Sequence, residues 1–256
     1  VLAWMHMSTD FSDLSLMQIS DSFFPTGLYT MSNGLETLFP EINRKFDISL
    51  GIILEPTDNE VQLGCQGVVN AELKVEGTEA HSARPWLGKN AIYKTIPLLE
   101  NLKELSPESI LVDELDYKEV VSVTTISGGI AKNVIPGEVV CGINYRFAPD
   151  KTIKDAVRKL TNLLTDYGEL SIHDVAESAH PNKENKTVQK FIKITEACVQ
   201  PKQAWTDIAR FTNSGIPALN FGPGSQDLAH KKNEHVIVSD INKSYSLIKR
   251  FFMDQT

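Results

Sequence analysis

Residues 63–177 carry strand and helix patterns in the order β-α-β-β-α-β, and this order limits the possible folds more than any other feature of the sequence. Alternating apolar and polar residues from Val69 to Val75 predict the first strand. The later elements are expected over residues 90–105 (helix), 119–126 and 138–147 (strands), 153–164 (helix) and 170–175 (strand). This order is that of the split βαβ, or ferredoxin-like, unit, in which two helices cover one face of a four-stranded sheet.

Patterns of an α/β type lie on both sides of this unit. The expected elements are a strand over 48–54, a helix over 187–199, a strand over 216–221 and a C-terminal helix capped by Ser239. The simplest interpretation is an α/β domain interrupted by an inserted ferredoxin-like domain. Its two parts are residues 37–62 and 178–256, the polar stretch 178–186 is one crossing, and residues 1–36 form a separate N-terminal segment.

The 256 residues include 25 Lys and Arg against 33 Asp and Glu, a formal net charge of −8 that no basic cluster offsets. Binding to nucleic acid is therefore not expected. The longest apolar run, Ile48 to Leu54, is far shorter than the roughly 20 residues that span a bilayer, so a cytoplasmic protein without membrane attachment is expected. Cys65, Cys141 and Cys198 are too far apart for a cysteine-based zinc site or a disulfide framework.

Two segments of the α/β part carry possible metal ligands. Glu55 directly follows the apolar strand 48–54, and open α/β sheets place their sites at the carboxyl ends of such strands. His230 follows a loop that contains Gly222, Pro223 and Gly224. Carboxylate and neutral imidazole groups both suit zinc. An exposed loop position without a ligand role remains the alternative for each of the two residues.

A second set of residues, in the inserted unit, suits an anionic group. His81 and Arg84 lie where the first strand turns into its helix. An arginine pairs with a carboxylate through two hydrogen bonds and a histidine through one. Asn133, in a turn, and Arg146, on the polar face of its strand, could extend the same anion site, and ordinary turn and strand roles are the alternative. No glycine-rich phosphate loop or nucleophile elbow is present, so phosphoryl transfer and serine hydrolysis lack support.

Five short segments carry a stronger signal together than apart. They are Leu54–Asn59 (LEPTDN), Gly77–Trp86 (GTEAHSARPW), Asn133–Gly137 (NVIPG), Trp205–Asp207 (WTD), and Asn220–Gly224 (NFGPG) followed by Ala229 and His230. In this order they resemble the dinuclear-zinc aminoacylase/carboxypeptidase family of metallopeptidases, and within it the succinyl-diaminopimelate desuccinylases. The resemblance, from about Asn33 to the C-terminus, implies a partial zinc-exopeptidase-like α/β catalytic domain with an inserted dimerisation domain.

The resemblance also implies an activity, a partner and a cofactor. These are hydrolysis of an N-acyl amide bond in a small-molecule substrate, a homodimer, and two zinc ions per site, with cobalt as a further option. By position, Glu55 and His230 resemble the terminal ligands of the two metal ions. His81 resembles the residue that reaches across the dimer to stabilise charge on the scissile carbonyl oxygen. Asn133 and Arg146 resemble substrate-carboxylate binders, and Arg84 beside His81 indicates an acidic acyl group such as succinyl.

The N-terminal part departs from this family. The family places a His and a bridging Asp, then two adjacent Glu residues of which the first is the general base, early in its catalytic domain. Here no His is followed two residues later by Asp before Asn33, and no two Glu residues are adjacent anywhere. Residues 7–36 instead resemble the start of the F-type urease accessory protein, a helical protein that assists nickel loading. We therefore expect a recombined, misassembled or truncated reading frame that is inactive as given.

Two other functions stay open at this point. The inserted unit could serve as a non-catalytic dimerisation or anion-binding module. A role in urease maturation rests on the first 40 residues alone, and the strand-rich pattern after Asn59 argues against it, because that accessory protein is all helical.

Overall fold

The computed structural model describes residues 3–7, 48–229 and 231–254, and the chain divides into two compact units. Unit 1 comprises the described residues up to Cys65, the short turn Val112–Leu115, and the chain from Ala179 onward. Unit 2 comprises Gln66–Leu111 and Asp116–Ser178.

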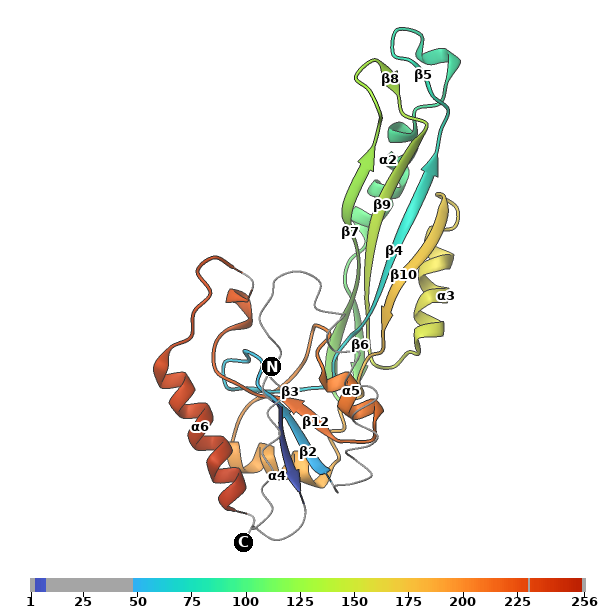
Figure 1. Ribbon diagram of the computed structural model, residues 1–256. Coiled ribbons are helices and arrows are strands. Elements are labelled where there is room, and N and C mark those ends of the chain that lie inside the picture. Colours follow the sequence, from blue (N-terminus) through green and yellow to red (C-terminus); the bar gives the residue numbers. More distant parts are fainter. Residues whose placement is uncertain (1–2, 8–47, 230, 255–256) are drawn as a thin grey trace. The chain divides into compact units, whose positions relative to one another are not determined.

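Unit 2 is built on a five-stranded antiparallel sheet with the strand order β10-β4-β9-β7-β6 (Figure 1). Its strands are β4 (Gly67–Glu76), β6 (Glu108–Val112), β7 (Leu115–Gly128), β9 (Glu138–Phe147) and β10 (Glu169–Ala176). The four expected strands are all present. The sheet has a fifth strand, β6, because the chain forms a hairpin into β7, with Asp113 and Glu114 in the left-handed conformation that such a tight turn requires.

Two helices, α2 (Ala91–Glu104) and α3 (Ile153–Leu164), cover one face of this sheet. Their first turns are capped by Asn90 and Thr152, whose side chains accept hydrogen bonds from backbone amides. The apolar residues of β4 and β9 that point to this face pack with those of the helices to form the core of the unit. The expected ferredoxin-like order is confirmed, and α2 contains Pro97 in its interior.

One end of unit 2 extends beyond the main sheet, and we call it the tip. It contains the two-stranded sheet of β5 (Ala80–His81) and β8 (Val134–Ile135) and the single-turn helix η2 (Pro85–Leu87). Figure 1 shows β5 and β8 at the end of the unit opposite to β6. The tip therefore gathers two of the segments that the sequence singled out, around His81 and Asn133.

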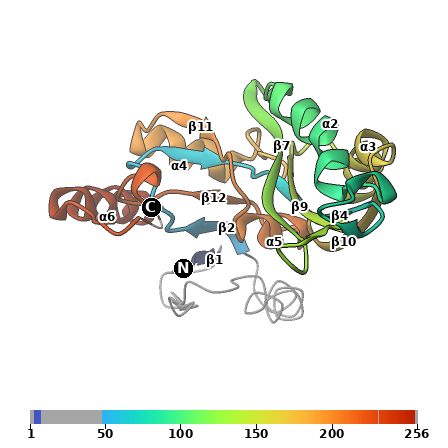
Figure 2. The same cartoon turned by 90° about the horizontal axis from the view of Figure 1, so that it is seen from above.

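Unit 1 contains a mixed sheet with the strand order β1-β2-β12-β3-β11 (Figure 2). Its strands are β1 (Ala3–Met7), β2 (Ile48–Ile53), β3 (Val61–Leu63), β11 (Val199–Pro201) and β12 (Ala218–Asn220). β12 runs parallel to β2 and β11 parallel to β3, whereas β1 is antiparallel to β2. The N-terminal segment was expected to be helical, but residues 3–7 form a strand; the rest of the stretch resembling the urease accessory protein, residues 8–36, lies outside the described residues.

The helices of unit 1 are α4 (Lys186–Thr195), α5 (Ile208–Asn213) and α6 (Val238–Met253), with the single turn η3 (Gln226–Leu228). α4 and α6 pack together through edge-to-face contacts that Phe191 makes with Phe221 and Phe251. α6 begins at Val238, so Ser239 is not its cap, and the expected helix over 187–199 ends at Thr195 because β11 follows. None of the described helices is both long and apolar enough to cross a membrane.

Candidate functional site

Glu55 stands two residues beyond the end of β2, as its position in the sequence predicted. Its backbone N–H donates to the carbonyl oxygen of Ile53 at 2.9 Å, and its side chain is partly buried. The loop that begins at Gly222 touches it from the other side, since a Cβ atom at Gly222 would lie 2.5 Å from the Glu55 carbonyl oxygen. A glycine is therefore required there for the two loops to meet.

A buried lysine that sequence patterns did not indicate lies beside Glu55. The ammonium nitrogen of Lys202 is 4.0 Å from Glu55 Oε2 and 3.2 Å from Gln226 Oε1, and the residue is only 4% exposed. Burial lowers the pKa of Lys202, and the charge of Glu55 acts in the opposite direction. Lys202 thus links Glu55 to η3, the turn that leads toward His230.

The described residues do not fit a zinc centre. No three His, Cys, Asp or Glu side chains in this part of the chain are grouped so that they could hold a metal ion. Glu55 faces the ammonium of Lys202, and His230 lies outside the described residues. Because zinc sites use three or four protein ligands, Glu55 alone does not make one.

The tip brings His81 and Asn133 together on neighbouring segments. The backbone N–H of Ser82 donates to the carbonyl oxygen of Asn133 at 2.8 Å, and His81 pairs with Val134 in the small sheet. The exposed imidazole of His81 accepts a hydrogen bond from the backbone N–H of Ala83 at Nδ1, 3.1 Å away. With Nδ1 as acceptor, the neutral ring carries its proton on Nε2.

Arg84 lies in the same turn as His81. Its backbone N–H donates to the carbonyl oxygen of His81 at 2.8 Å, and the residue is exposed. The tip therefore offers an imidazole, a guanidinium and a side-chain amide to a ligand outside unit 2. This grouping agrees with the anion-binding chemistry of these residue types.

Arg146 does not belong to this group within one chain, contrary to the single anion site considered from the sequence. It is the cross-strand partner of Val68, at the end of β4 that is remote from the tip. The tip begins at Gly77, whose backbone N–H donates to the carbonyl oxygen of Gly137. Between Val68 and Gly77 the chain extends about 30 Å along β4, at roughly 3.3 Å per residue. The guanidinium of Arg146 donates through Nε to Asn144 Oδ1 at 3.0 Å, which leaves both terminal nitrogens available to a carboxylate.

Trp205, Asp207 and Arg210 form a local structure at the start of α5. Asp207 is the cap residue of the helix, Arg210 Nε lies 3.5 Å from Asp207 Oδ1, and the guanidinium stacks over the Trp205 ring at 5.4 Å. These contacts form a local pairing at the start of the helix. α5 itself escaped the sequence patterns because it has only six residues.

A buried charged network in unit 2 was also missed. The carboxylate of Glu119, only 3% exposed, accepts hydrogen bonds from Tyr145 Oη, the Ala148 backbone N–H and Lys159 Nζ, and pairs with Lys151. Burial alone would raise the pKa of Glu119, but the hydrogen bonds from the two lysines outweigh it and lower that pKa. A Glu in an alternating strand pattern gives no sign of such a role.

Exposed apolar side chains gather on η2, α2 and the outer end of β7. They are Trp86, Leu87, Ile92, Tyr93, Ile96, Ile126 and Ile130. The β6 strand has only five residues, so among the described residues the outer edge of β7 beyond about Val120 has no neighbouring strand. An apolar face next to an open strand edge favours pairing with another protein surface.

Residues 63–170 match the sequence profile of a peptidase dimerisation domain. A putative succinyl-diaminopimelate desuccinylase of Mycobacterium tuberculosis is 36% identical over 86% of this chain and 62% of its own length. A succinyl-diaminopimelate desuccinylase of Corynebacterium glutamicum is 31% identical over 87% of this chain and 62% of its own length. The chain therefore spans about three-fifths of the length of these relatives.

Solved structures share the fold. A tripeptidase of Staphylococcus aureus superposes with a TM-score of 0.67 at 18% identity and covers 88% of this chain and 62% of that one. An M20 family metallo-carboxypeptidase of Sulfolobus solfataricus gives a TM-score of 0.63 at 16% identity, with 85% and 66% covered. The mixed α/β fold with its inserted domain is thus that of these peptidases.

Proposed function

Because this chain belongs to the M20 family of metallopeptidases, we propose that it is part of a homodimeric, cytoplasmic hydrolase of N-acyl amide bonds in amino-acid-type substrates. The succinyl group is the proposed acyl group, as in the names of the desuccinylase relatives. The side chains that support this proposal lie at opposite ends of unit 2. We assign one end to the scissile bond and the other end to a carboxylate of the substrate.

We assign the tip to the scissile bond. The main observation that supports this assignment is the hydrogen bond that Nδ1 of His81 accepts from the backbone N–H of Ala83. Since Nδ1 accepts from the Ala83 backbone N–H, the proton on Nε2 is free to be donated outward. A donor of this kind stabilises the negative charge that develops on a carbonyl oxygen during amide hydrolysis. We assign Asn133 and Arg84, whose backbone segments are hydrogen-bonded to Ser82 and His81, to the polar groups of the same substrate.

The other end of the sheet is assigned to substrate carboxylate. The free terminal nitrogens of Arg146 suit a two-bond pairing with a carboxylate. Because Arg146 and His81 are about 30 Å apart along β4, one substrate molecule cannot touch both residues of the same chain. The two residues act on one substrate only if they come from different copies, and this makes a dimer part of the proposed function.

We assign the dimer contact to the apolar face of α2 and the open edge of β7. Ile126, which is 55% exposed, is the cross-strand partner of Cys141 in the helix-side core, so it lies on the face that α2 covers. Tyr93, on α2, is 69% exposed. Burying these side chains against a second copy removes apolar surface from water while the β7 edges pair.

The metal remains the open part of the proposal. Two zinc ions per site, with Glu55 and His230 among their ligands, are what the family resemblance implies, and cobalt is the second candidate. Because the described residues do not make a zinc centre, no step of the reaction is assigned to a metal here. We propose that the chain as given binds substrate without completing hydrolysis.

A non-catalytic anion-binding module is the second candidate. It is favoured by the same observation, that the described residues contain no group of three His, Cys, Asp or Glu side chains that could hold a metal ion. Restored turnover in a dimer with a complete relative separates this candidate from the incomplete hydrolase, because a dedicated binding module would not support catalysis.

The first experiment measures binding and turnover on the purified chain with N-succinyl-diaminopimelate and added Zn²⁺. Calorimetry should detect binding, Arg146→Ala should weaken it at least about tenfold, which is about 1.4 kcal/mol, and Arg158→Ala, an exposed arginine on α3, should not. Release of succinate by the chain alone would contradict the proposal that its metal centre is incomplete. Absence of binding would contradict the assigned substrate.

A further inference from the structure

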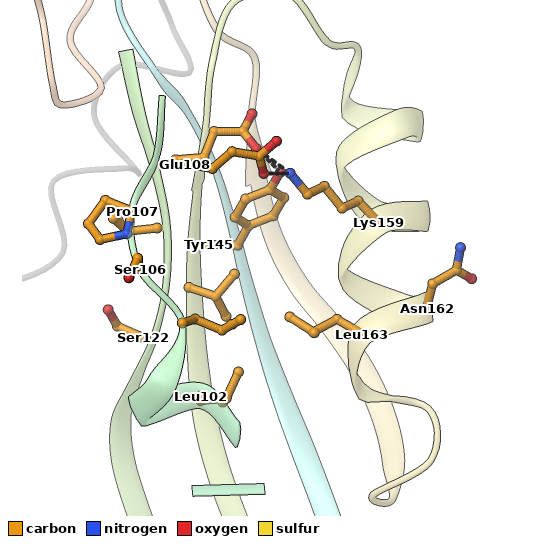
Figure 3. A pocket seen from close by; sticks show the side chains of 13 residues that line it. Leu102, Ser106, Pro107, Glu108, Ser122, Tyr145, Lys159, Asn162 and Leu163 are labelled. Atoms are coloured by element: carbon orange, nitrogen blue, oxygen red, sulfur yellow. Dashed lines mark hydrogen bonds and ion pairs between the residues drawn. The ribbon is translucent and has the colours of Figure 1, made fainter. Parts of the chain in front are cut away.

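A cleft of about 580 Å³ lies on the helix-covered face of unit 2 and is separate from the residues assigned to hydrolysis. It lies between the end of α2, the start of β6, β7 and α3 (Figure 3). Tyr145 lines it, whereas the next residue, Arg146, points to the opposite face of the sheet because side chains alternate along a strand. The cleft therefore needs a function of its own.

The body of the cleft is apolar. Leu102 from α2, Val121 from β7 and Leu163 from α3 line it, together with the ring of Tyr145. Figure 3 shows Leu102 and Leu163 reaching toward the space from opposite sides and the ring of Tyr145 at its upper end. An aliphatic group of modest size suits such a surface, since small-molecule sites combine an apolar wall with a few polar groups.

A pair of opposite charges closes one end of the cleft. Lys159 Nζ lies 2.5 Å from Glu108 Oε2 and 2.7 Å from Glu119 Oε2. Glu119 is buried and already has Tyr145, Ala148 and Lys151 as partners, so its role is structural. Glu108 and Lys159 are both partly exposed, Glu108 pairs with Lys159, and the ammonium of Lys159 has a third N–H to donate.

We propose that this cleft binds a free α-amino acid with an aliphatic side chain. The ligand carboxylate accepts from Lys159 while the ligand ammonium pairs with Glu108, so the existing ion pair is extended and not broken. The aliphatic side chain lies against Leu102, Val121 and Leu163. This proposal goes beyond the hydrolase function and stands without it.

The balance of charge at this end favours a zwitterion over a ligand with one charge. A simple carboxylic acid would bring a fourth carboxylate to the network of Glu108, Glu119 and Asp150, and a simple amine would bring a third ammonium next to Lys151 and Lys159. Like charges at such distances repel, more strongly where water is partly excluded. An α-amino acid carries both charges a few ångströms apart and adds no net charge.

Calorimetric titration of the full chain with L-leucine tests the proposal, with N-acetyl-L-leucinamide as the probe that has the same side chain and no charges. L-Leucine should bind, and N-acetyl-L-leucinamide should bind at least about tenfold more weakly. Glu108→Gln, at a partly exposed position, should weaken leucine binding at least about tenfold, a change of about 1.4 kcal/mol. Lys154→Met, on the same helix α3 but outside the cleft, should leave it unchanged.

Three results would overturn the proposal: no heat with L-leucine, equal binding of the two probes, or wild-type affinity in Glu108→Gln. The Arg146→Ala chain locates the ligand, because it should bind leucine as the wild type does. Loss of leucine binding in Arg146→Ala, with binding kept in Glu108→Gln, would place leucine in the hydrolase site and refute the cleft. Since no turnover is measured, failure here leaves the proposed hydrolase untouched.

Discussion

The backbone N–H of Ser82 donates to the carbonyl oxygen of Asn133 at 2.8 Å, and this bond joins two segments that are fifty residues apart in the sequence. It places His81 and Asn133 side by side at the tip of unit 2. Arg146, another predicted binding residue of unit 2, is about 30 Å away at the other end of β4. This separation is the reason why the proposed hydrolase requires two copies of the chain.

Replacing Glu119 should destabilise unit 2. Its buried carboxylate has two lysine partners, and Glu119→Gln removes the charge that they share, while Lys151 keeps Asp150 and Lys159 keeps Glu108 as partners. Removing one partner of a buried hydrogen-bonded group in this way costs about 1–3 kcal/mol. Chemical denaturation should show a loss of that size in the free energy of unfolding. The matched substitution Glu100→Gln, at an exposed position on α2, should change it by less than about 0.5 kcal/mol.

The same residue predicts how stability depends on pH. The folded-state pKa of Glu119 is lowered from its usual 4.5, because the lysine hydrogen bonds outweigh the burial that would raise it. Its stabilising contribution is therefore complete above the unfolded-state pKa and is lost as the pH falls through the lower, folded-state value. The difference in unfolding free energy between wild type and Glu119→Gln should be largest near about pH 6 and shrink toward about pH 3. A difference that stays constant over this range would refute the assigned ion pairs.

The assigned dimer contact predicts that substitutions on β7, and not on the opposite edge strand of the sheet, weaken the dimer. Ile126→Lys, on β7, places a charge in the proposed contact and should raise the dimer dissociation constant by at least about tenfold, or about 1.4 kcal/mol. Ile172→Lys makes the same change at an exposed position of β10, the opposite edge strand, and should have no effect. Sedimentation at micromolar concentration measures both. Dissociation by Ile172→Lys alone would move the contact to the β10 edge.

Replacing Asn220 should cost little free energy of unfolding. It is fully buried in β12, and neither atom of its side-chain amide has a hydrogen-bond partner in the part of the chain that the structure describes. An unpaired buried amide costs about 1–3 kcal/mol, so Asn220→Leu should leave the free energy of unfolding unchanged or raise it.

Thr57→Val is the contrasting case for Asn220→Leu. The Thr57 hydroxyl makes hydrogen bonds with the Glu60 carbonyl oxygen and with both backbone groups of Gly222, so its removal should destabilise the chain by about 1–3 kcal/mol. Differential scanning calorimetry compares the two variants. A larger loss in Asn220→Leu than in Thr57→Val would mean that the Asn220 amide has a partner, such as an ordered water.

The sequence predicted the ferredoxin-like unit because its strands and helices are long and regular. The period-2 pattern around Val69–Val75 and the helical spacing from Ile153 to Leu164 each extend over enough residues to be read without tertiary context. Short elements were missed, among them the six-residue α5 and the three-residue β11 of unit 1. Such elements are stabilised by packing against the rest of unit 1 and leave little periodic trace in the sequence.

The candidate site residues could be proposed from the sequence, but their placement in the structure could not. His81, Asn133 and Glu55 stand at turns and strand ends, where local sequence indicates function. The separation of Arg146 from His81 depends on the register of β4 with β9, which a single sequence does not reveal. Lys202 gave no signal because an isolated lysine is normally exposed, and its burial follows from contacts with Leu63, Gln226 and Glu55.

The account is tested most directly by asking whether His81 acts on a substrate held by another copy. The chain is coexpressed with the putative mycobacterial desuccinylase in which the residue aligned with His81 is replaced by alanine, and differently tagged heterodimers are purified. The wild-type chain should restore release of succinate from N-succinyl-diaminopimelate, and the His81→Ala chain should not, although both form heterodimers. Equal activity of the two heterodimers would contradict the assignment of His81 to the scissile bond across the dimer.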